Sequence, residues 1–380
     1  MRIALLTDGI YPYVIGGMQK HSFYLARYFA QNKIEVDLYH TAADFEEANR
    51  LSCFFEEEKK YIHSFLIPFP KLDKFPGHYI RESYAYSAAI YDALKKNKPV
   101  DFVYVQGLCG MKLLEMKNLN TPVGINFHGL EMFQKAAGTK TKLEQYLFKR
   151  PVLRSMRNAD VVFSLGGKLS KIITDQGISQ SKIIEIPIGI DESWIRSQPL
   201  KVNPKRKFVF VGRYERRKGV KELTEVLNQL LPAQNFSFEF IGAIPEDKKL
   251  SSEKIIYHGA ISDFKKIQGI LSEADVLVCP SYSEGMPTVI LEAMASGLAI
   301  IASDVGAVSE QVDNTNGILV EPGNKLLLKK SIVIFIKMPQ NQLIEMKQYS
   351  IQKIKNQFLW EDVIEKTIYE IEKVIKSSYH

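Results

Sequence analysis

Residues 274–293 read Ala-Asp-Val-Leu-Val-Cys-Pro-Ser-Tyr-Ser-Glu-Gly-Met-Pro-Thr-Val-Ile-Leu-Glu-Ala, two apolar runs separated by a loop. The pattern predicts a buried strand over Ala274–Cys279, a loop that ends at Glu284, and a helix that Pro287 opens. Proline suits a first helical turn, where its missing N–H has no partner to lose. The start of such a helix presents free N–H groups and partial positive charge, which favours an anion such as phosphate.

Two glutamates lie eight residues apart in this unit. Glu284 ends the loop, and Glu292 lies five residues into the helix, about 7.5 Å from its start at 1.5 Å per residue. The Glu292 side chain leans back toward the helix N-terminus, so both carboxylates can face one ligand. Carboxylates bind vicinal hydroxyls, and the spacing fits a nucleotide sugar with Glu284 on the sugar and Glu292 on the ribose. An ordinary loop and helix with one solvated glutamate would give the same spacing.

The same alternation of short apolar strands and helical stretches recurs along the chain, which predicts an α/β fold with two doubly wound parallel sheets. A polar stretch near residues 190–205 separates a first domain, 1–195, from a second, 196–360. Ligands bind at the carboxyl ends of strands in such sheets, so we expect the site in the cleft between the domains. No Gly-x-Gly-x-x-Gly follows the first strand of either half, which disfavours a nicotinamide or flavin enzyme. The expected strands are 3–7, 35–39, 102–106, 123–127, 161–165, 183–186, 208–211, 238–241, 255–257, 276–279, 299–302 and 317–320.

The composition is that of a globular protein of 380 residues with a formal net charge of +7. The charge favours an anionic partner: a nucleotide, a nucleic acid or an anionic membrane. Three scattered cysteines favour a reducing compartment over disulfides. The N-terminus is unlike a signal peptide, and no apolar run reaches the roughly 18 residues of a membrane span. We therefore expect a cytoplasmic protein, either free or peripheral at a membrane.

Two further segments carry glycine and a histidine at strand ends. Gly16 and Gly17 follow the first strand and enter a helix, where glycine lets backbone N–H groups approach a diphosphate closely. A flexible loop with a helix cap is the alternative. His128 follows the strand that ends near Phe127, at the predicted catalytic edge of the first sheet, although a lone histidine is more often structural.

The segment Gly212–Gly219 carries four cations within six residues, directly after the first strand of the second half. Arg213 can hold two oxygens in a fork, and Lys218 can act as a point charge on a phosphate. We expect Arg216 and Arg217 to lie on the surface.

Together these segments resemble the GT-B retaining glycosyltransferases of family 4, from Met1 to about Gly323. The resemblance implies a GT-B fold, a UDP- or GDP-sugar donor and transfer with retention at the anomeric carbon. It places Gly16 and Gly17 over the donor phosphates and His128 near the reacting carbon. It also implies that a last helix, about 361–377, packs back on the first domain. The residues it assigns to catalysis are His128, Arg213, Lys218 and Glu284; those it assigns to the donor are Gly16, Gly17, Arg213, Lys218, His258, Ile261, Glu284, Gly285, Met286, Pro287 and Glu292.

The acceptor, the metal requirement and the membrane are separate predictions. Because the chain lacks Asp-x-Asp, we expect no metal and no cofactor, with Arg213, Lys218 and helix N-termini supplying the positive charge. We expect a glycan or lipid-linked acceptor of cell-surface polysaccharide or glycolipid synthesis, and no nucleic acid. Residues 135–157 interleave cations with apolar residues, which fits either an anionic membrane surface or a packed helix with a solvated basic face. The rival functions are a GT-B epimerase or phosphorylase and a non-catalytic nucleotide-sugar-binding subunit.

Overall fold

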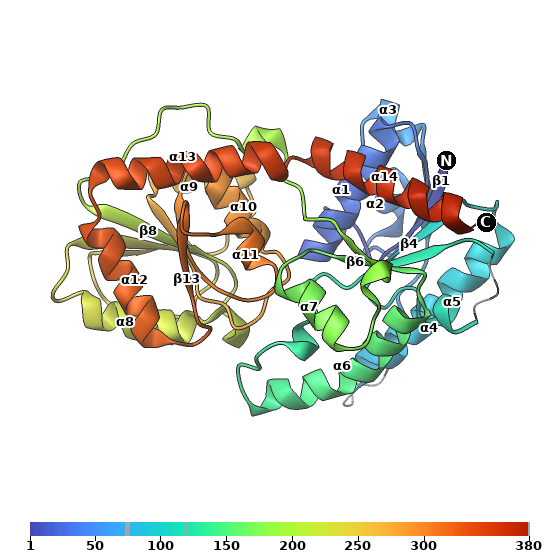
Figure 1. Cartoon of the computed structure of the whole chain (residues 1–380), viewed down its shortest axis with the longest axis horizontal. Helices are drawn as coiled ribbons and strands as arrows, with labels where there is room; N and C mark the ends of the chain where they lie inside the picture. Colours follow the sequence, from blue (N-terminus) through green and yellow to red (C-terminus); the bar gives the residue numbers. More distant parts are fainter. Residues whose placement is uncertain (73–76, 117, 119, 379–380) are drawn as a thin grey trace.

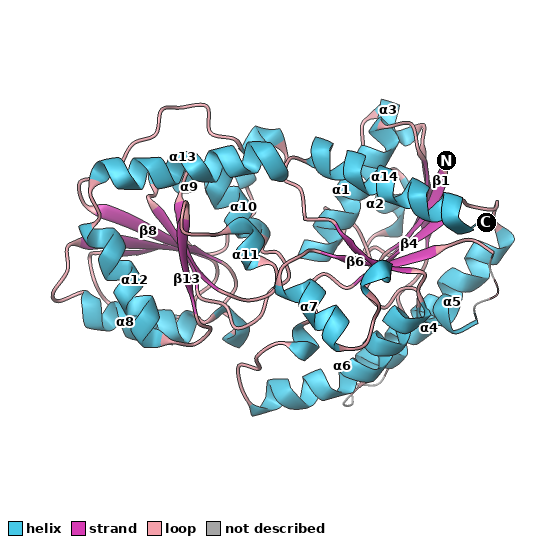
Figure 2. Ribbon diagram, in the orientation of Figure 1, coloured by secondary structure: helices cyan, strands magenta, loops and turns pink. Residues whose placement is uncertain are grey.

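The computed structural model describes residues 1–72, 77–116, 118 and 120–378 and shows two lobes, each built on a parallel sheet (Figures 1 and 2). Within the described residues the first sheet has seven strands in the order β3-β2-β1-β4-β5-β6-β7, and the second has six in the order β10-β9-β8-β11-β12-β13. All neighbouring strands run parallel, so the predicted class of two doubly wound α/β halves in a GT-B arrangement is confirmed.

The first half alternates strands and helices along the chain. Its strands are β1 (Arg2–Leu6), β2 (Glu35–His40), β3 (Ile62–Leu66), β4 (Phe102–Gln106), β5 (Val123–Asn126), β6 (Val161–Ser164) and β7 (Ile183–Glu185). Its helices are α1 (Gly17–Gln31), α2 (Phe45–Asn49), α3 (Glu56–Lys59), α4 (His78–Lys96), α5 (Met111–Met116), α6 (Thr139–Asn158) and α7 (Lys168–Asp175).

The second half repeats the plan. Its strands are β8 (Arg206–Val211), β9 (Phe236–Ile241), β10 (Ile255–Tyr257), β11 (Val276–Cys279), β12 (Ala299–Ser303) and β13 (Gly317–Val320). Its helices are α8 (Val220–Leu230), α9 (Phe264–Glu273), α10 (Thr288–Ala295), α11 (Val308–Gln311), α12 (Lys325–Lys337) and α13 (Gln340–Gln357), and α14 (Trp360–Ser378) follows.

The strands form where short apolar segments can be covered on both faces, as a parallel sheet requires. Every residue of β11 and β12 is buried, as are four of the five residues of β1. Each expected strand is present to within two residues at either end. The edge strand β3 was not predicted, because Ile62-His-Ser-Phe-Leu66 is short and only Ile62 is buried.

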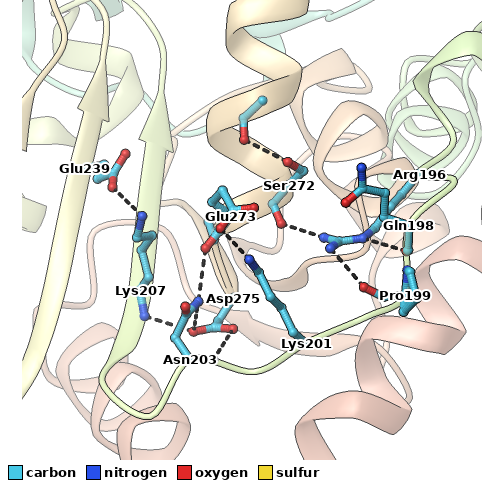
Figure 3. Close-up of polar contacts among 12 residues, drawn as sticks. Arg196, Gln198, Pro199, Lys201, Asn203, Lys207, Glu239, Ser272, Glu273 and Asp275 are labelled. Carbon is cyan, nitrogen blue, oxygen red and sulfur yellow. Dashed lines mark hydrogen bonds and ion pairs between the residues drawn. The ribbon is translucent and has the colours of Figure 1, made fainter.

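The chain between the two sheets is fixed to the second half (Figure 3). Arg196 donates to the carbonyl oxygen of Ser272 at the end of α9. Asn203 donates to the Asp275 carboxylate across 3.0 Å, just before β11. The predicted domain boundary between residues 195 and 196 lies at the start of this anchored segment. The linker that follows the first half is therefore held in place by contacts with the second half.

The last helix leaves the second half and lies on the first (Figure 1). Trp360, at the start of α14, stacks on the rings of Tyr24 and Tyr28 of α1, with centroids 5.4 and 5.7 Å away. The Tyr28 hydroxyl donates to Glu361 across 3.2 Å. Two connections therefore join the halves: the linker, and the passage from α13 to α14.

Candidate active site

The predicted site segments follow the central strands of the two sheets. In each sheet the strand order reverses between the first strand and its crossover partner, β1 with β4 and β8 with β11. Ligands of doubly wound sheets bind outside the carboxyl ends of strands at such a point. The glycine pair (Gly16 and Gly17) follows β1, the cation turn (Gly212–Gly219) follows β8, and the loop that carries Glu284 follows β11. The sequence motifs and the sheet topology therefore indicate the same cleft.

Glu284 lies in that cleft with its carboxylate almost fully buried. Oε1 accepts hydrogen bonds from Lys218 Nζ at 2.5 Å and Ser281 Oγ at 2.7 Å. Among the described residues Oε2 has one longer contact, 3.4 Å from a guanidinium nitrogen of Arg217. One carboxylate oxygen is thus saturated by protein groups, whereas the other retains capacity for a ligand hydroxyl.

The cation turn packs closely against the loop that carries Glu284. Gly219 adopts φ +69°, and a Cβ there would lie 2.0 Å from the carbonyl oxygen of Pro280, so glycine is required for the close approach. The Tyr282 amide donates to the Arg217 carbonyl across 2.7 Å. These contacts hold Lys218 against Glu284.

The four cations of the turn pair with three glutamates, Glu215, Glu222 and Glu284. Arg217, expected on the surface, is instead half-buried between Glu215 and Glu284, and is a site residue that the sequence reasoning missed. Arg216 is exposed, as expected, and forms a two-pronged ion pair with Glu222. The Arg213 side chain is 79% exposed and pairs with Glu215 across 2.9 Å.

His128 belongs to a hydrogen-bonded cluster in the first half. Its Nε2 lies 2.6 Å from Gln106 Oε1, while Gln106 Nε2 lies 3.1 Å from Nδ1 of His21. The amide oxygen only accepts, so Nε2 of His128 carries the proton and Nδ1 keeps a lone pair. Burial lowers the pKa of His128 to about 4, and burial and the neighbouring His128 hold the pKa of His21 well below its usual value. Both rings are therefore neutral near pH 7.

The His128 loop touches the Glu284 loop across the cleft. A Cβ at Gly285 would lie 2.5 Å from the His128 carbonyl oxygen, so the two backbones meet where only glycine fits. Gln134 donates through Nε2 to the carbonyl oxygens of Gly129 and Glu284 at 2.5 and 2.6 Å. Gln134 had no sequence signal, and it ties together two loops from opposite halves.

Glu292 faces the cleft from α10, whose other residues after Thr288 are apolar. Its Oε1 pairs with Lys20 Nζ of α1 at 2.9 Å. Pro287 is the N-cap of α10, not its first helical residue, because its backbone is extended with ψ 117°. Gly17 opens α1 and lines a small cavity together with Lys20 and Glu292. The structure therefore brings Gly17 and Glu292 to one cavity, where Lys20 pairs with Glu292.

Three predicted donor residues have structural contacts of their own. His258 pairs through Nε2 with the buried Glu239 across 2.8 Å. Met286 is buried, and its sulfur accepts from the Ile188 amide at 3.2 Å. Ile261 is partly buried against the core. Any donor contact from Met286 would thus come from its backbone.

The basic stretch forms α6 and the loop before it, along the lower edge in Figure 1. Leu143 and Tyr146 are each 64% exposed, beside exposed Lys142, Lys149 and Arg150. The second half of α6 is anchored by buried Val152 and Met156. Among the described residues no helix is both long and apolar enough to cross a bilayer.

Two family models match the chain on either side of the linker. The model described as Glycosyltransferase Family 4 matches residues 15–194, and the model described as Glycosyl transferases group 1 matches residues 205–337. The first match includes the glycine pair and His128, and the second includes the cation turn and both glutamates.

Relatives and a solved structure agree with this match. The chain is 31% identical over 189 residues to the putative teichuronic acid biosynthesis glycosyltransferase of Bacillus subtilis, 47% of each chain. It is also 31% identical over 188 residues to an N,N'-diacetylbacillosaminyl-diphospho-undecaprenol alpha-1,3-N-acetylgalactosaminyltransferase of Campylobacter jejuni, 47% of this chain and 49% of that one. The matched region thus spans about half the length of each relative.

The fold resembles that of sucrose-phosphate synthase from Thermosynechococcus elongatus, with a TM-score of 0.81 at 18% identity over 99% of both chains. At that identity the likeness concerns the fold alone. The two family models, which together match well over half of the chain, and the two-sheet architecture show that this chain belongs to the GT-B glycosyltransferases of the family 4 type.

Proposed function

We propose that the protein is a retaining hexosyltransferase that moves a sugar from a UDP- or GDP-sugar to a glycan or lipid-linked acceptor of cell-surface polysaccharide or glycolipid synthesis. The observation that carries the proposal is the Glu284 carboxylate, buried at the end of β11 with Lys218 on Oε1 and capacity left on Oε2. The family relationship supplies the reaction type.

In this proposal Lys218 serves the sugar side and the phosphate side of the donor at once. An ammonium group has three N–H donors. One is used on Glu284 Oε1, which leaves two for oxygens of the diphosphate. Glu284 Oε2 accepts a hydroxyl of the donor sugar, and Arg217, 3.4 Å from it, adds a second cation beside the leaving group. Departure of the nucleoside diphosphate develops negative charge, and preorganised cations stabilise that charge in the transition state.

His128 contributes as a neutral group. Its protonated Nε2 is occupied by Gln106, and the structure gives Nδ1 no hydrogen-bond partner among the described residues. A neutral Nδ1 accepts a hydrogen bond, so it suits a sugar hydroxyl beside the anomeric carbon. With a pKa of about 4 the ring is neutral near pH 7, so Nδ1 has no proton to give to the leaving group. Retention then proceeds by same-face attack, in which the leaving phosphate oxygen takes the acceptor proton.

The acceptor side of the proposal rests on the relatives and on α6. The Campylobacter jejuni relative is named for a diphospho-undecaprenol substrate. Exposed Leu143 and Tyr146 lie among cations on α6, as at a surface that binds anionic lipid. We propose that α6 brings the cleft to a lipid-linked acceptor at the membrane.

Donor turnover separates this proposal from its rivals. The purified protein would be incubated with a panel of UDP- and GDP-sugars, and release of nucleoside diphosphate and the anomeric form of the sugar product would be measured. A retaining transferase releases nucleoside diphosphate slowly from one donor and faster with acceptor. A binding subunit binds a donor without any release, and an epimerase returns an altered nucleotide sugar.

A further inference from the structure

The Lys20–Glu292 ion pair occupies a carboxylate that the donor is expected to use. Nζ and Oε1 are 2.9 Å apart, and the two side chains are 32% and 12% exposed. The pair joins the first turn of α1 to the middle of α10, and hence the first half to the second. It is built from residues 272 positions apart.

The ion pair meets an electrostatic need of Glu292. Glu292 is the one charged residue of α10, and a carboxylate removed from water without a partner is costly. Lys20 supplies the partner, and its ammonium also lies 5.7 Å from the centroid of the Trp194 ring. Burial lowers the pKa of Lys20, but the attraction of Glu292 outweighs this and the net pKa is raised. Lys20 therefore stays charged.

The space beside the pair is too small for a sugar ring. The cavity lined by Gly17, Lys20, Trp194, Thr288 and Glu292 has a volume of about 20 Å³, room for roughly one water molecule. A ribose that binds both carboxylate oxygens of Glu292 through its two hydroxyls therefore requires Lys20 to leave Oε1. The displaced Lys20 ammonium would have an alternative partner in the diphosphate. Lys20 lies on the first turn of α1, directly after the glycine pair that is predicted to bind the diphosphate.

We propose that the donor ribose and Lys20 compete for Glu292, and that the displaced Lys20 ammonium then pairs with the diphosphate. This inference rests on the proposed function for the presence of a nucleotide donor in the cleft. It assigns Lys20 two opposite effects on one ligand: it opposes the nucleoside part and attracts the phosphate part. A nucleoside alone must therefore break the Lys20–Glu292 pair without compensation. A nucleoside diphosphate supplies phosphate oxygens with which the displaced Lys20 ammonium pairs.

The two effects separate in Lys20→Met, which keeps the aliphatic stem but has no charge or donor. Binding of uridine and UDP, and of guanosine and GDP, would be measured by ligand-observed NMR and calorimetry. We expect the nucleoside to bind about 5-fold tighter, because a site occluded for most of the time becomes free. We expect the diphosphate to bind about 10-fold weaker, because a charge-assisted contact is lost. Lys20→Arg should restore the diphosphate affinity.

Lys171→Met is the matched control, since it removes an exposed ion pair with Asp175 on α7 and should change neither affinity. Thermal unfolding of each variant checks that the fold is intact. Unchanged or weaker nucleoside binding in Lys20→Met would overturn the competition, and equal tightening of nucleoside and diphosphate would overturn the phosphate contact. A wild-type protein that binds neither UDP nor GDP would instead overturn the proposed function on which the inference rests.

Discussion

The Lys218 ammonium and the Glu284 carboxylate lie 2.5 Å apart, with 15% and 8% of the two side chains exposed. A cation and an anion that are both poorly hydrated depend strongly on each other, and each gains from a ligand that carries the complementary group. The proposed donor carries both: anionic phosphates for Lys218 and hydroxyls for Glu284. The pair thus links the charge of the leaving group to recognition of the sugar.

Removal of the Lys218 charge should therefore slow donor turnover strongly. We expect Lys218→Ala to lower kcat/KM by about 100-fold or more, equivalent to about 3 kcal/mol for one transition-state charge partner. Arg217→Ala should cost about 10-fold, because its contact to Glu284 is longer, at 3.4 Å. Steady-state release of nucleoside diphosphate measures both.

Arg213 gives a sharper comparison within the same turn. The family resemblance predicts a phosphate contact, yet its side chain is 79% exposed and pairs with Glu215. If it swings onto the donor, Arg213→Ala should also lose about 100-fold. Lys171→Ala, on an exposed face of α7, serves as the control. Near-wild-type turnover of both Lys218→Ala and Arg213→Ala would refute this assignment of the cations.

Metal removal tests whether protein cations alone serve the diphosphate. Because Asp-x-Asp is absent and Lys218 and Arg217 lie in the cleft, we expect full activity after dialysis against excess EDTA. Activity that disappears with EDTA and returns with Mg²⁺ or Mn²⁺ would show that a metal carries the charge instead.

Three histidines, His21 and His40 buried and His128 partly buried, should make the fold sensitive to mild acid. Burial lowers the pKa of His40 and of His128 to about 4 and holds that of His21 well below its usual value. Between about pH 6.5 and pH 4 the unfolded chain binds protons that the folded protein excludes. The free energy of unfolding should therefore fall as pH drops through this range.

The contribution of His40 to this pH dependence can be measured with a His40 variant, because His40 lies outside the cleft. Each excluded proton contributes about 1.4 kcal/mol per pH unit to the slope of the unfolding free energy. Urea unfolding of wild type and His40→Gln at pH 7, 6 and 5 should give a shallower slope for the variant by about that amount. Parallel slopes would show that His40 titrates normally in the folded protein.

The contacts of several site residues could not be predicted from the sequence. The strand–loop–helix units and the motifs at their ends were readable, because apolar periodicity and glycine positions are local signals. The partners of Arg217 and Arg216 were not, since adjacent cations look alike until the turn fixes their directions. The contacts of Gln134 and Lys20 span 150 and 272 residues, and they exist only because the two halves dock.

Membrane binding through α6 is a further expectation. Each cation near an anionic surface contributes about 1 kcal/mol, screened by salt. Wild type should sediment with anionic vesicles at low salt and not with zwitterionic ones. Replacement of Lys142, Lys149 and Arg150 by Gln should weaken this without changing donor hydrolysis.

The matched control removes three exposed cations from α13 and α14, two helices that lie away from α6 in Figure 1. These are Lys355 on α13 and Lys373 and Lys376 on α14, and their replacement by Gln should leave vesicle binding nearly intact. Equal weakening in both triple variants would show a general charge effect. A wild type that ignores anionic vesicles even at low salt would leave α6 as a solvated helix face and favour an acceptor in solution.

The division of labour between the two glutamates is tested by calorimetry on Glu284→Gln and Glu292→Gln, each titrated with the nucleoside diphosphate and with the intact donor. The account predicts that Glu292→Gln weakens both ligands, because the ribose is common to them. It predicts that Glu284→Gln leaves the affinity for the nucleoside diphosphate nearly unchanged and weakens only the nucleotide sugar. Equal losses for both ligands in both variants would contradict the placement of the donor in this cleft.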